Sequence, residues 1–291
     1  MKPTIKEING TGPIRHVTYT CPKHGDYTVT RLFNKDGTAI GPSDACPICA
    51  EEWADAHREE LVEKCRLERE ERRKRQEEAR KEERERQLKI AVASSNIPRE
   101  YRNVDLSAIA FEEKGNEETL RQVRLYAEKF DELKDSGVGL FLYGETGTGK
   151  THLACALLRA LMPEVRGIYA MTWEIIRAVK AAGFQDDPLA PLIEAPLLVI
   201  DEIGVQYGSK FEETALYPLI DSRVAERRPT IFISNVQPDT KDADRRGETL
   251  RGMLGERLWD RVQYRSIFLP LHGASVRKRY RSVDELLEGG E

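Results

Sequence analysis

The stretch Val138-Gly-Leu-Phe-Leu-Tyr-Gly-Glu-Thr-Gly-Thr-Gly-Lys-Thr151 joins an apolar run to a glycine-rich loop, and a helical pattern follows over residues 152–161. The loop matches G-x-x-x-x-G-K-[ST] in the context that this pattern requires, after a strand and before a helix. Glycines let backbone N–H groups curl around phosphate oxygens, and the helix N-terminus adds positive potential. The sequence therefore predicts a nucleotide phosphate-binding loop. The alternative is a glycine-rich turn without a ligand.

Every residue of this loop is a candidate for binding the nucleotide. Lys150 is expected to reach the β- and γ-phosphates of ATP, and the Thr151 hydroxyl is expected to ligate Mg²⁺. The residues assigned to the nucleotide are Gly144, Glu145, Thr146, Gly147, Thr148, Gly149, Lys150, Thr151 and His152.

Four further apolar runs, at residues 167–171, 196–200, 230–234 and 266–269, alternate with helical patterns. Uninterrupted runs of Val, Ile, Leu and Phe indicate strands that are buried on both faces. Strands of this kind that alternate with helices are typical of a doubly wound α/β domain with a parallel sheet. We assign this domain to residues 93–291.

Two carboxylates end the run that begins at Leu197, namely Asp201 and Glu202. The carboxyl ends of parallel strands lie at the edge of the sheet where ligands bind. Asp201 is expected to hold Mg²⁺ through water, and Glu202 to polarise the attacking water. The pair therefore predicts an ATPase. The alternative is a core strand that ends in solvated acids.

Asn235 ends the run at 230–234, a strand that in this topology can lie between the other two. An amide at that place can bridge the attacking water and the γ-phosphate. Asn also commonly ends strands at turns. Its assignment as a catalytic sensor therefore depends on the phosphate loop and the Asp-Glu pair beside it.

Residues 1–54 are assigned to a small zinc-binding module. Cys21 and His24 form a C-x₂-H pair, Cys46 and Cys49 form a C-x₂-C pair, and 21 residues separate the pairs. The two-residue gap lets a tight turn present both ligands to one tetrahedral Zn²⁺, and four protein ligands favour a structural rather than a catalytic site. An odd total of five cysteines indicates reduced thiols rather than a disulfide framework. The alternative is unrelated thiols and a surface histidine.

Residues 55–92 are assigned to a charged helical spacer. In 51–90, 27 of 40 residues are charged, none is Gly or Pro, and Glu precedes Lys or Arg by four positions at seven places. A coiled coil is the alternative, but between positions 66 and 87 only Leu67 and Ala79 are apolar, so a single solvated helix is favoured. The first turns have an apolar stripe that is expected to pack on the zinc module: Trp53, Ala54, Leu61 and Val62.

The charge balance limits the class of protein. With 46 basic and 50 acidic residues, the net charge of −4 excludes a nucleic-acid binder that works by bulk charge alone. No stretch approaches 18 consecutive apolar residues, and the first ten residues lack an apolar signal core. We therefore expect a cytoplasmic protein with no membrane partner, and any nucleic-acid site must be local.

Together these residues resemble the AAA+ ATPases, and Leu254-Gly-Glu-Arg-Leu-Trp-Asp-Arg-Val262 with Ala274-Ser-Val-Arg277 sharpens the resemblance. The match is closest to the DnaC/DnaI helicase loaders and the related IstB transposition helpers, over roughly residues 97–280. The resemblance implies that Arg261 is a trans arginine finger, acting on ATP bound to a neighbouring subunit, and that Arg277 is the second sensor. Arg257 lies one turn from Arg261, so the two roles could be exchanged, and structural salt bridging is the alternative for both.

Two features vary from the general AAA+ pattern. Only 22 residues follow position 269, too few for the helical lid of most AAA+ proteins, and the loaders are similarly short there. Ser209-Lys-Phe-Glu212 is a capping box expected to open a helix through about Arg223. In loaders and initiators the corresponding region helps to contact single-stranded DNA. The candidate phosphate partners are Lys210, Arg223, Arg227 and Arg228, with a solvated basic face as the alternative.

The resemblance implies an ATP-dependent loader of a hexameric replicative helicase, which it would bind through residues 1–90. It further implies binding of single-stranded DNA and self-association through the ATP interface, with ATP, Mg²⁺ and Zn²⁺ as cofactors. The zinc module favours the DnaI-like branch. An IstB-like helper of DNA transposition would share every ATPase residue and is the alternative. A zinc-dependent DNA-binding module with a vestigial ATPase is disfavoured, because Lys150, Asp201, Glu202 and Arg261 are all present.

Overall fold

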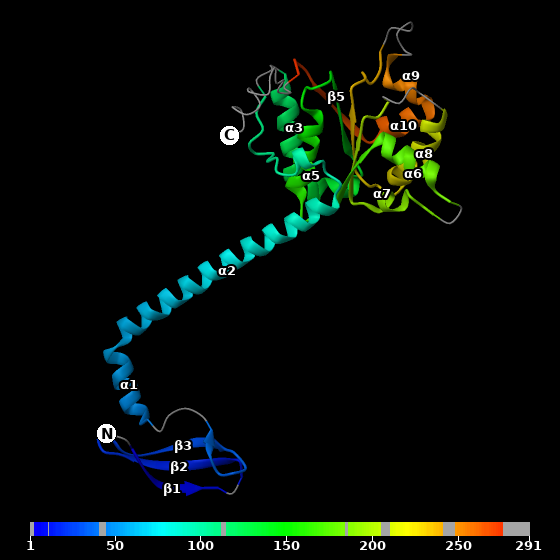
Figure 1. The fold of residues 1–291 in the computed structure, drawn as a ribbon. Coiled ribbons are helices and arrows are strands. Elements are labelled where there is room, and N and C mark those ends of the chain that lie inside the picture. The colour runs from blue at the N-terminus through cyan, green and yellow to red at the C-terminus, as the bar shows by residue number, and fades with distance from the viewer. Residues whose placement is uncertain are drawn as a thin grey trace, which may run out of the picture. The chain divides into compact units, whose positions relative to one another are not determined.

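The computed structural model describes residues 3–10, 12–40, 45–111, 115–183, 186–204, 210–240 and 248–275. It divides the chain into two compact units, Met1–Lys81 and Glu82–Glu291, with the boundary inside one long helix. Figure 1 labels the helices and strands of both units. Each unit is described by itself.

The first unit begins with an antiparallel sheet in the order β1-β2-β3-β4. Its strands are β1 (Thr4–Asn9), β2 (Ile14–Cys21), β3 (Gly25–Phe33) and β4 (Ala39–Ile40). Val17, Tyr19 and Cys21 alternate with less buried residues along β2, because successive side chains of a strand point to opposite faces. Helix α1 (Pro47–Ala56) follows, with Pro47 in the first turn, where its missing N–H is not needed.

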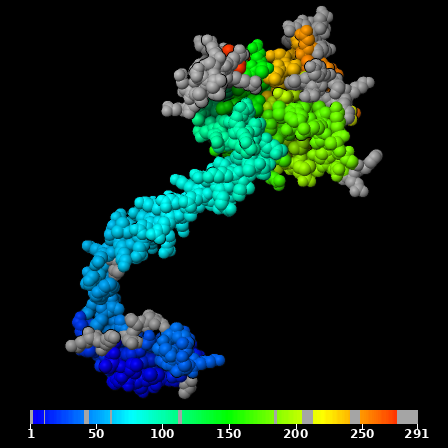
Figure 2. All heavy atoms as spheres, in the orientation of Figure 1, coloured from blue at the N-terminus to red at the C-terminus, as the bar shows by residue number. Residues whose placement is uncertain are grey.

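The charged segment forms a helix, as the spacing of its residues predicts, but with a break before it. Helix α2 (Arg58–Ser94) is separated from α1 at His57, and every side chain described between 58 and 87 is exposed. Figure 2 shows these side chains projecting from the helix on the side in view. At the end of α2, Leu88, Ala91 and Val92 pack into the core of the second unit, so the helix is not solvated throughout.

The apolar stripe predicted to pack on the zinc module is largely exposed where the structure describes it. Trp53 is 56% exposed and its ring stacks on His57, and Val62 is 63% exposed. Ala54 is half-buried, and the side chain of Leu61 lies outside the described residues. At the break, His57 Nδ1 lies 2.8 Å from the Trp53 carbonyl oxygen. The rings of the two residues stack with their centroids 4.5 Å apart, so the partner of the Trp53 ring is His57.

The second unit is built on a five-stranded sheet in the order β6-β7-β8-β5-β9, and each strand pair given for it is parallel. The strands are β5 (Gly139–Gly144), β6 (Gly167–Met171), β7 (Leu197–Asp201), β8 (Thr230–Ser234) and β9 (Ser266–Leu271). The predicted parallel α/β sheet is therefore confirmed. Strand β8 lies between β5 and β7, which is the order the prediction for Asn235 required.

Helices cover both faces of this sheet (Figure 1). One core joins the end of α2, α3 (Asn116–Glu128), α4 (Phe130–Leu133) and α5 (Lys150–Leu161) to one face. The other core joins α6 (Thr172–Ala181), α8 (Lys210–Ala225), α9 (Leu250–Leu254) and α10 (Glu256–Tyr264) to the opposite face, with α7 (Ala190–Glu194) at its border. Two short 3-10 turns, Arg99–Tyr101 and Lys134–Ser136, complete the unit. The sequence after Ser275, in which a reduced lid was predicted, lies outside the described residues.

Candidate functional site

A cavity of about 490 Å³ opens at the carboxyl ends of β5, β7 and β8. It contains residues from the phosphate loop, from the Asp-Glu pair and from the segment after α2. Its lining consists of Glu100, Tyr101, Thr146, Gly147, Gly149, Lys150, Thr151, His152, Asp201, Glu202, Ile233 and Asn235. The structure therefore brings together residues up to 135 positions apart, including Lys150, Asp201, Glu202 and Asn235 of the predicted site.

The phosphate loop can take its path only with glycine at particular positions. Gly144 ends β5 with a φ of +148°, and a Cβ there would lie 1.9 Å from the Leu271 carbonyl oxygen. Gly149 has a φ of +91°, and a Cβ there would lie 3.2 Å from the ring of Phe111. The first glycine lets β9 approach the loop, and the second opens α5 in a conformation that other residues rarely adopt.

Lys150 lies folded against its own loop. Its Nζ donates to the carbonyl oxygens of Gly144 and Glu145, at 3.0 and 2.6 Å, and the side chain is buried. Thr148 Oγ1 lies 3.4 Å from the same nitrogen. The ammonium therefore lies inside the curl of backbone, where phosphate oxygens would replace the carbonyls as its partners.

Asp201 is held at the end of β7 by three donors, one on α5, one on β6 and one in the backbone directly after β7. Thr151 Oγ1 and the Tyr169 hydroxyl donate to its Oδ2 at 2.9 and 2.7 Å, and the Glu202 N–H donates to its Oδ1 at 2.7 Å. Burial and then the Asp201 charge raise the pKa of Tyr169, so its hydroxyl remains a donor. The contact between Thr151 and Asp201 brings together the two predicted Mg²⁺ ligands. Two hard oxygen ligands beside a phosphate site fit that ion.

Glu202 and Asn235 line the same cavity because the backbone after β7 is hydrogen-bonded to β8. The Ile203 N–H donates to the Ile233 carbonyl at 3.1 Å, and Ser234 Oγ donates to the Ile203 carbonyl at 2.8 Å. Glu202 has a φ of +60°, a left-handed conformation that costs a residue with a side chain about 1–3 kcal/mol. The surrounding hydrogen bonds hold this strained residue where it lines the cavity beside Asn235.

Two aromatic rings also line the cavity: His152, which the sequence assigned to the nucleotide, and Tyr101, which it did not. Tyr101 meets His152 edge-on, with ring centroids 5.9 Å apart, and Glu100 lies beside them in the lining. Burial lowers the pKa of His152. Tyr101 belongs to the segment after α2, about 50 residues from the loop, and no local pattern marks it.

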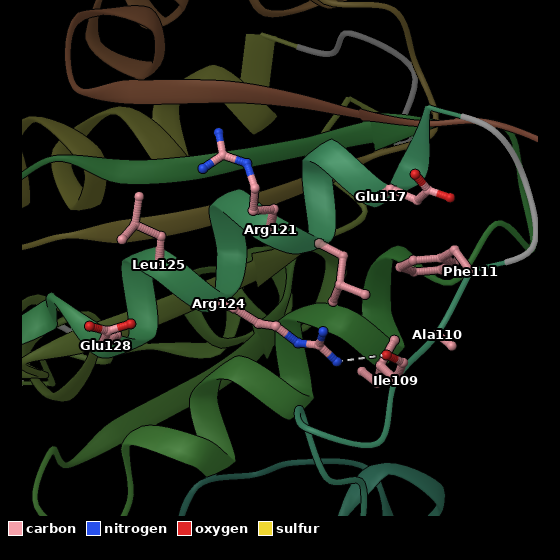
Figure 3. Close-up of a pocket in the computed structure, with 9 residues that line it drawn as sticks. Ile109, Ala110, Phe111, Glu117, Arg121, Arg124, Leu125 and Glu128 are labelled. Atoms are coloured by element: carbon pink, nitrogen blue, oxygen red, sulfur yellow. Dashed lines mark hydrogen bonds between the residues drawn. The ribbon is translucent and has the colours of Figure 1, made fainter.

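A second cavity, of about 530 Å³, lies between residues 109–111 and the outer side of α3 (Figure 3). Arg124 crosses it and donates to the carbonyl oxygens of Ser107 and Ile109 at 2.9 and 2.8 Å. This contact fixes the segment that ends in Phe111, whose ring lies against Gly149. Arg124 thus helps to hold Phe111 beside the phosphate loop.

The two candidate finger arginines lie on α10, and neither is in the lining given for the nucleotide cavity of their own chain. Arg261 Nε donates to Asp221 Oδ1 on α8 at 2.6 Å, and its Nη1 lies 3.4 Å from Asp260 Oδ2. The Arg257 guanidinium lies over the Tyr217 ring, 4.2 Å from its centroid. Arg277 lies outside the described residues.

The prediction that Arg223 contacts DNA phosphates is wrong. Arg223 is a residue of α8 whose side chain is fully buried, and its Nε donates to Thr230 Oγ1 at 2.9 Å. Its terminal nitrogens donate to the carbonyl oxygens of Leu192, Ile193, Ala195 and Pro229. Arg223 therefore ties α7 to the start of β8 and satisfies backbone acceptors that no water can reach. Arg227 remains exposed, whereas Arg228 is half-buried and donates to the Glu194 carbonyl; Ser209 and the side chain of Lys210 lie outside the described residues.

The four predicted zinc ligands converge in the first unit, where their ligand atoms all lie within 4.8 Å of one another. His24 Nδ1 lies 3.2 Å from Cys49 Sγ and 3.6 Å from Cys46 Sγ, and the sulfurs of Cys21 and Cys49 are 3.7 Å apart. A tetrahedral ion with bonds of about 2.3 Å needs ligand atoms about 3.8 Å apart. The spacing of these atoms therefore fits Zn²⁺.

The surroundings of the cluster also suit a metal site. The Lys23 N–H donates to Cys21 Sγ at 3.4 Å, and this bond, followed by the backbone bond from His24 and the bonds with Cys49 and Cys46, lowers the pKa of the Cys21 thiol to about 6. Glu52 on α1 lies 3.4 Å from His24 Nε2, so a carboxylate faces the ring nitrogen that points away from the cluster. Such a partner orients a metal-binding histidine and fixes its tautomer.

None of the helices in the described part of the chain has an apolar stretch long enough to cross a membrane.

Comparison with known proteins identifies relatives of this chain. The model of the family described as IstB-like ATP binding protein matches residues 55–284, so residues 1–54 lie outside the match. The replicative helicase loader DnaC of Escherichia coli strain K12 is 30% identical over 187 residues, which cover 62% of this chain and 71% of the relative. DnaC of Buchnera aphidicola subsp. Schizaphis graminum is 30% identical over 196 residues, covering 64% and 74%.

Solved structures share the fold. A crystal structure of the DnaC helicase loader aligns with a TM-score of 0.54 and 24% identity, over 60% of this chain and 100% of that one. A crystal structure of DnaI aligns with a TM-score of 0.50 and 23% identity, over 62% and 95%. At these identities the likeness supports the fold of the second unit.

Proposed function

The chain belongs to the IstB-like ATP-binding protein family. We propose that it is an ATP-dependent loader of a replicative DNA helicase. The observation that supports this role most directly is the 30% identity to DnaC replicative helicase loaders, over 71% of the Escherichia coli protein. We propose that ATP binding joins subunits on the helicase and on single-stranded DNA, and that hydrolysis releases them.

In this proposal the phosphate loop binds the triphosphate and Lys150 turns from its carbonyl partners to the β- and γ-phosphates. Thr151 and Asp201 would hold Mg²⁺, whose charge, when the ion is bound, offsets the negative charge that develops on the phosphates. Tyr169 keeps Asp201 in place through its hydroxyl. The hydrogen bonds around Asp201 therefore orient the carboxylate before the nucleotide arrives.

For hydrolysis, Glu202 would accept the proton of the attacking water, and Asn235 would bind that water and the γ-phosphate together. Both line the same cavity as Lys150. Arg261 would come from a neighbouring subunit, because it is not in the lining of its own cavity. The enzyme would then be fully active only when assembled.

The zinc module would bind the helicase, with residues 1–90 as the contact region. A metal ion held by Cys21, His24, Cys46 and Cys49 would stabilise the fold of this module, because a module of this size cannot bury enough apolar surface alone. Metal analysis is expected to find about one zinc per chain, as a four-ligand site requires.

Cys46→Ser is expected to lose the zinc and the fold of the first unit, while ATP binding by the second unit persists. Cys65→Ser is the matched control, since Cys65 is an exposed cysteine on α2 and should leave the zinc content unchanged. Zinc content is measured by elemental analysis and the fold by heteronuclear NMR. Full zinc retention in Cys46→Ser would contradict the proposed site.

The rival role is an IstB-like helper of DNA transposition, which would share the ATP-binding domain that the family describes. The two roles are separated by the partner. With ATP present, the full chain is expected to co-elute with a hexameric replicative helicase in size-exclusion chromatography with light scattering, and Cys46→Ser is expected to reduce this binding at least tenfold. Binding to a transposase without binding to the helicase would favour the rival.

A further inference from the structure

Helices α8 and α10 are in contact through two α8 residues that have no role in the proposed mechanism. Tyr217 and Asp221 are four positions apart on α8, and Arg257 and Arg261 are four positions apart on α10. Residues at this spacing lie on one face of a helix. Each residue of the first pair contacts one of the second, Tyr217 with Arg257 at 4.2 Å and Asp221 with Arg261 at 2.6 Å.

We propose that Asp221 is a positioning residue, which orients the Arg261 guanidinium toward nucleotide bound to a neighbouring subunit. This inference depends on the proposed trans action of Arg261. It concerns the same site from the side of the subunit that donates the arginine.

The atoms of the contact favour orientation over blockage. Asp221 Oδ1 accepts from Nε, the nitrogen at the base of the guanidinium, rather than from both terminal nitrogens. A fork onto phosphate oxygens uses terminal nitrogens. The contact thus fixes the plane of the group and directs its forked end away from Asp221, where Nη1 makes a longer, exposed contact with Asp260 Oδ2 at 3.4 Å.

The packing of α10 makes such a guide useful. Leu258, Trp259 and Val262 are buried, so the helix itself is fixed on the sheet. The Arg261 side chain is 38% exposed and has several rotatable bonds, so without a partner it would sample many orientations. A charged reacting group displaced by about 1 Å can lose about 10²-fold in rate.

The second contact supports the choice of Arg261 over Arg257. The Arg257 guanidinium lies over the face of Tyr217, where cation–π attraction holds its broad surface. The flat face of the Arg257 guanidinium therefore lies against the Tyr217 ring of the same chain. Asp221 and, after it, Tyr217 raise the pKa of Arg261, so both α8 residues act on this arginine.

The test uses mixtures of two chains that are each inactive. Lys150→Ala lacks a working phosphate loop and donates an intact Arg261, and Arg261→Ala has a working loop and no finger. Their mixture is expected to regain ATP hydrolysis at mixed interfaces. Asp221→Ala is then added to one chain or to the other.

With Asp221→Ala on the Lys150→Ala chain, which donates the arginine, the regained rate is expected to fall about 10- to 100-fold. With Asp221→Ala on the Arg261→Ala chain, the rate should not change. Asp221→Asn, which keeps the acceptor oxygen without its charge, should give an intermediate rate. Glu118→Ala, which removes the exposed partner of Arg121 on α3, is the matched control and should change neither mixture.

Each other outcome contradicts the proposal in a distinct way. Equal loss from both placements would mean that Asp221 only stabilises the fold. No loss from either would mean that Arg261 orients itself. An inactive parent mixture of chains that still assemble would overturn the trans arginine in the proposed function, and the role of Asp221 with it.

Discussion

Arg261→Ala is expected to lower assembly-dependent ATP hydrolysis by about 10³–10⁵-fold, with little change in the affinity of the isolated chain for ATP. A guanidinium stays charged at all working pH values and forks onto phosphate oxygens, so it stabilises the charge of the transition state. The affinity should persist because Arg261 is not in the lining of its own nucleotide cavity. Phosphate release is measured against protein concentration, and affinity by titration with a fluorescent ATP analogue.

Two further variants test this assignment. Arg121→Ala removes an exposed, ion-paired arginine on α3 and should leave the rate near that of the parent chain. Arg257→Ala should have a much smaller effect than Arg261→Ala, because Arg257 lies over the Tyr217 ring of its own chain. If Arg261→Ala hydrolyses ATP normally and Arg257→Ala does not, the roles of the two arginines are exchanged.

Glu202→Gln is expected to lower hydrolysis by about 10²–10⁴-fold while ATP binding persists. The amide keeps the size and shape of the side chain, so it should fit the left-handed backbone at this position, but it cannot take the proton of the water. Single-turnover phosphate release measures the chemical step separately from product release. The variant should assemble with ATP and then fail to come apart.

Lys150→Ala provides the contrast, because it should weaken ATP binding itself. In the parent chain the Lys150 Nζ lies among the loop carbonyls, where phosphate oxygens would bind it. The alanine variant lacks this ammonium group. Hydrolysis by Glu202→Gln at the parental rate would show that another group positions the water. Asn235, which lines the same cavity, would then be examined first.

Much of the second unit could be predicted from residue order alone. The five apolar runs became five strands within one or two residues of the expected bounds, because a strand buried on both faces leaves a continuous apolar signal. The glycine-rich loop and the Asp-Glu pair were recognisable because each has its functional residues within a few consecutive positions.

The errors came where packing competes with a local pattern. Arg223 looked like a surface cation at the end of a helix, but the carbonyls of Leu192, Ile193 and Ala195 surround it in the folded chain. Trp53 looked like part of a buried stripe, but it stacks on His57 at a helix break. The charge of Arg223 and the apolar ring of Trp53 each suggested the wrong environment, because neither partner is predictable from spacing.

Residue order was therefore enough for the strands of the second unit, the phosphate loop, the pair of carboxylates and the two Cys/His motifs, since these depend on glycines, periodicity and spacing over a few residues. The tertiary structure decided which side chains are in contact. Asp221 reaches Arg261 across 40 positions, and Tyr169 reaches Asp201 across 32, because α8 packs beside α10 and β6 pairs with β7. Contacts of this kind follow from the arrangement of buried surfaces on the sheet, and a short window of sequence contains no information about that arrangement.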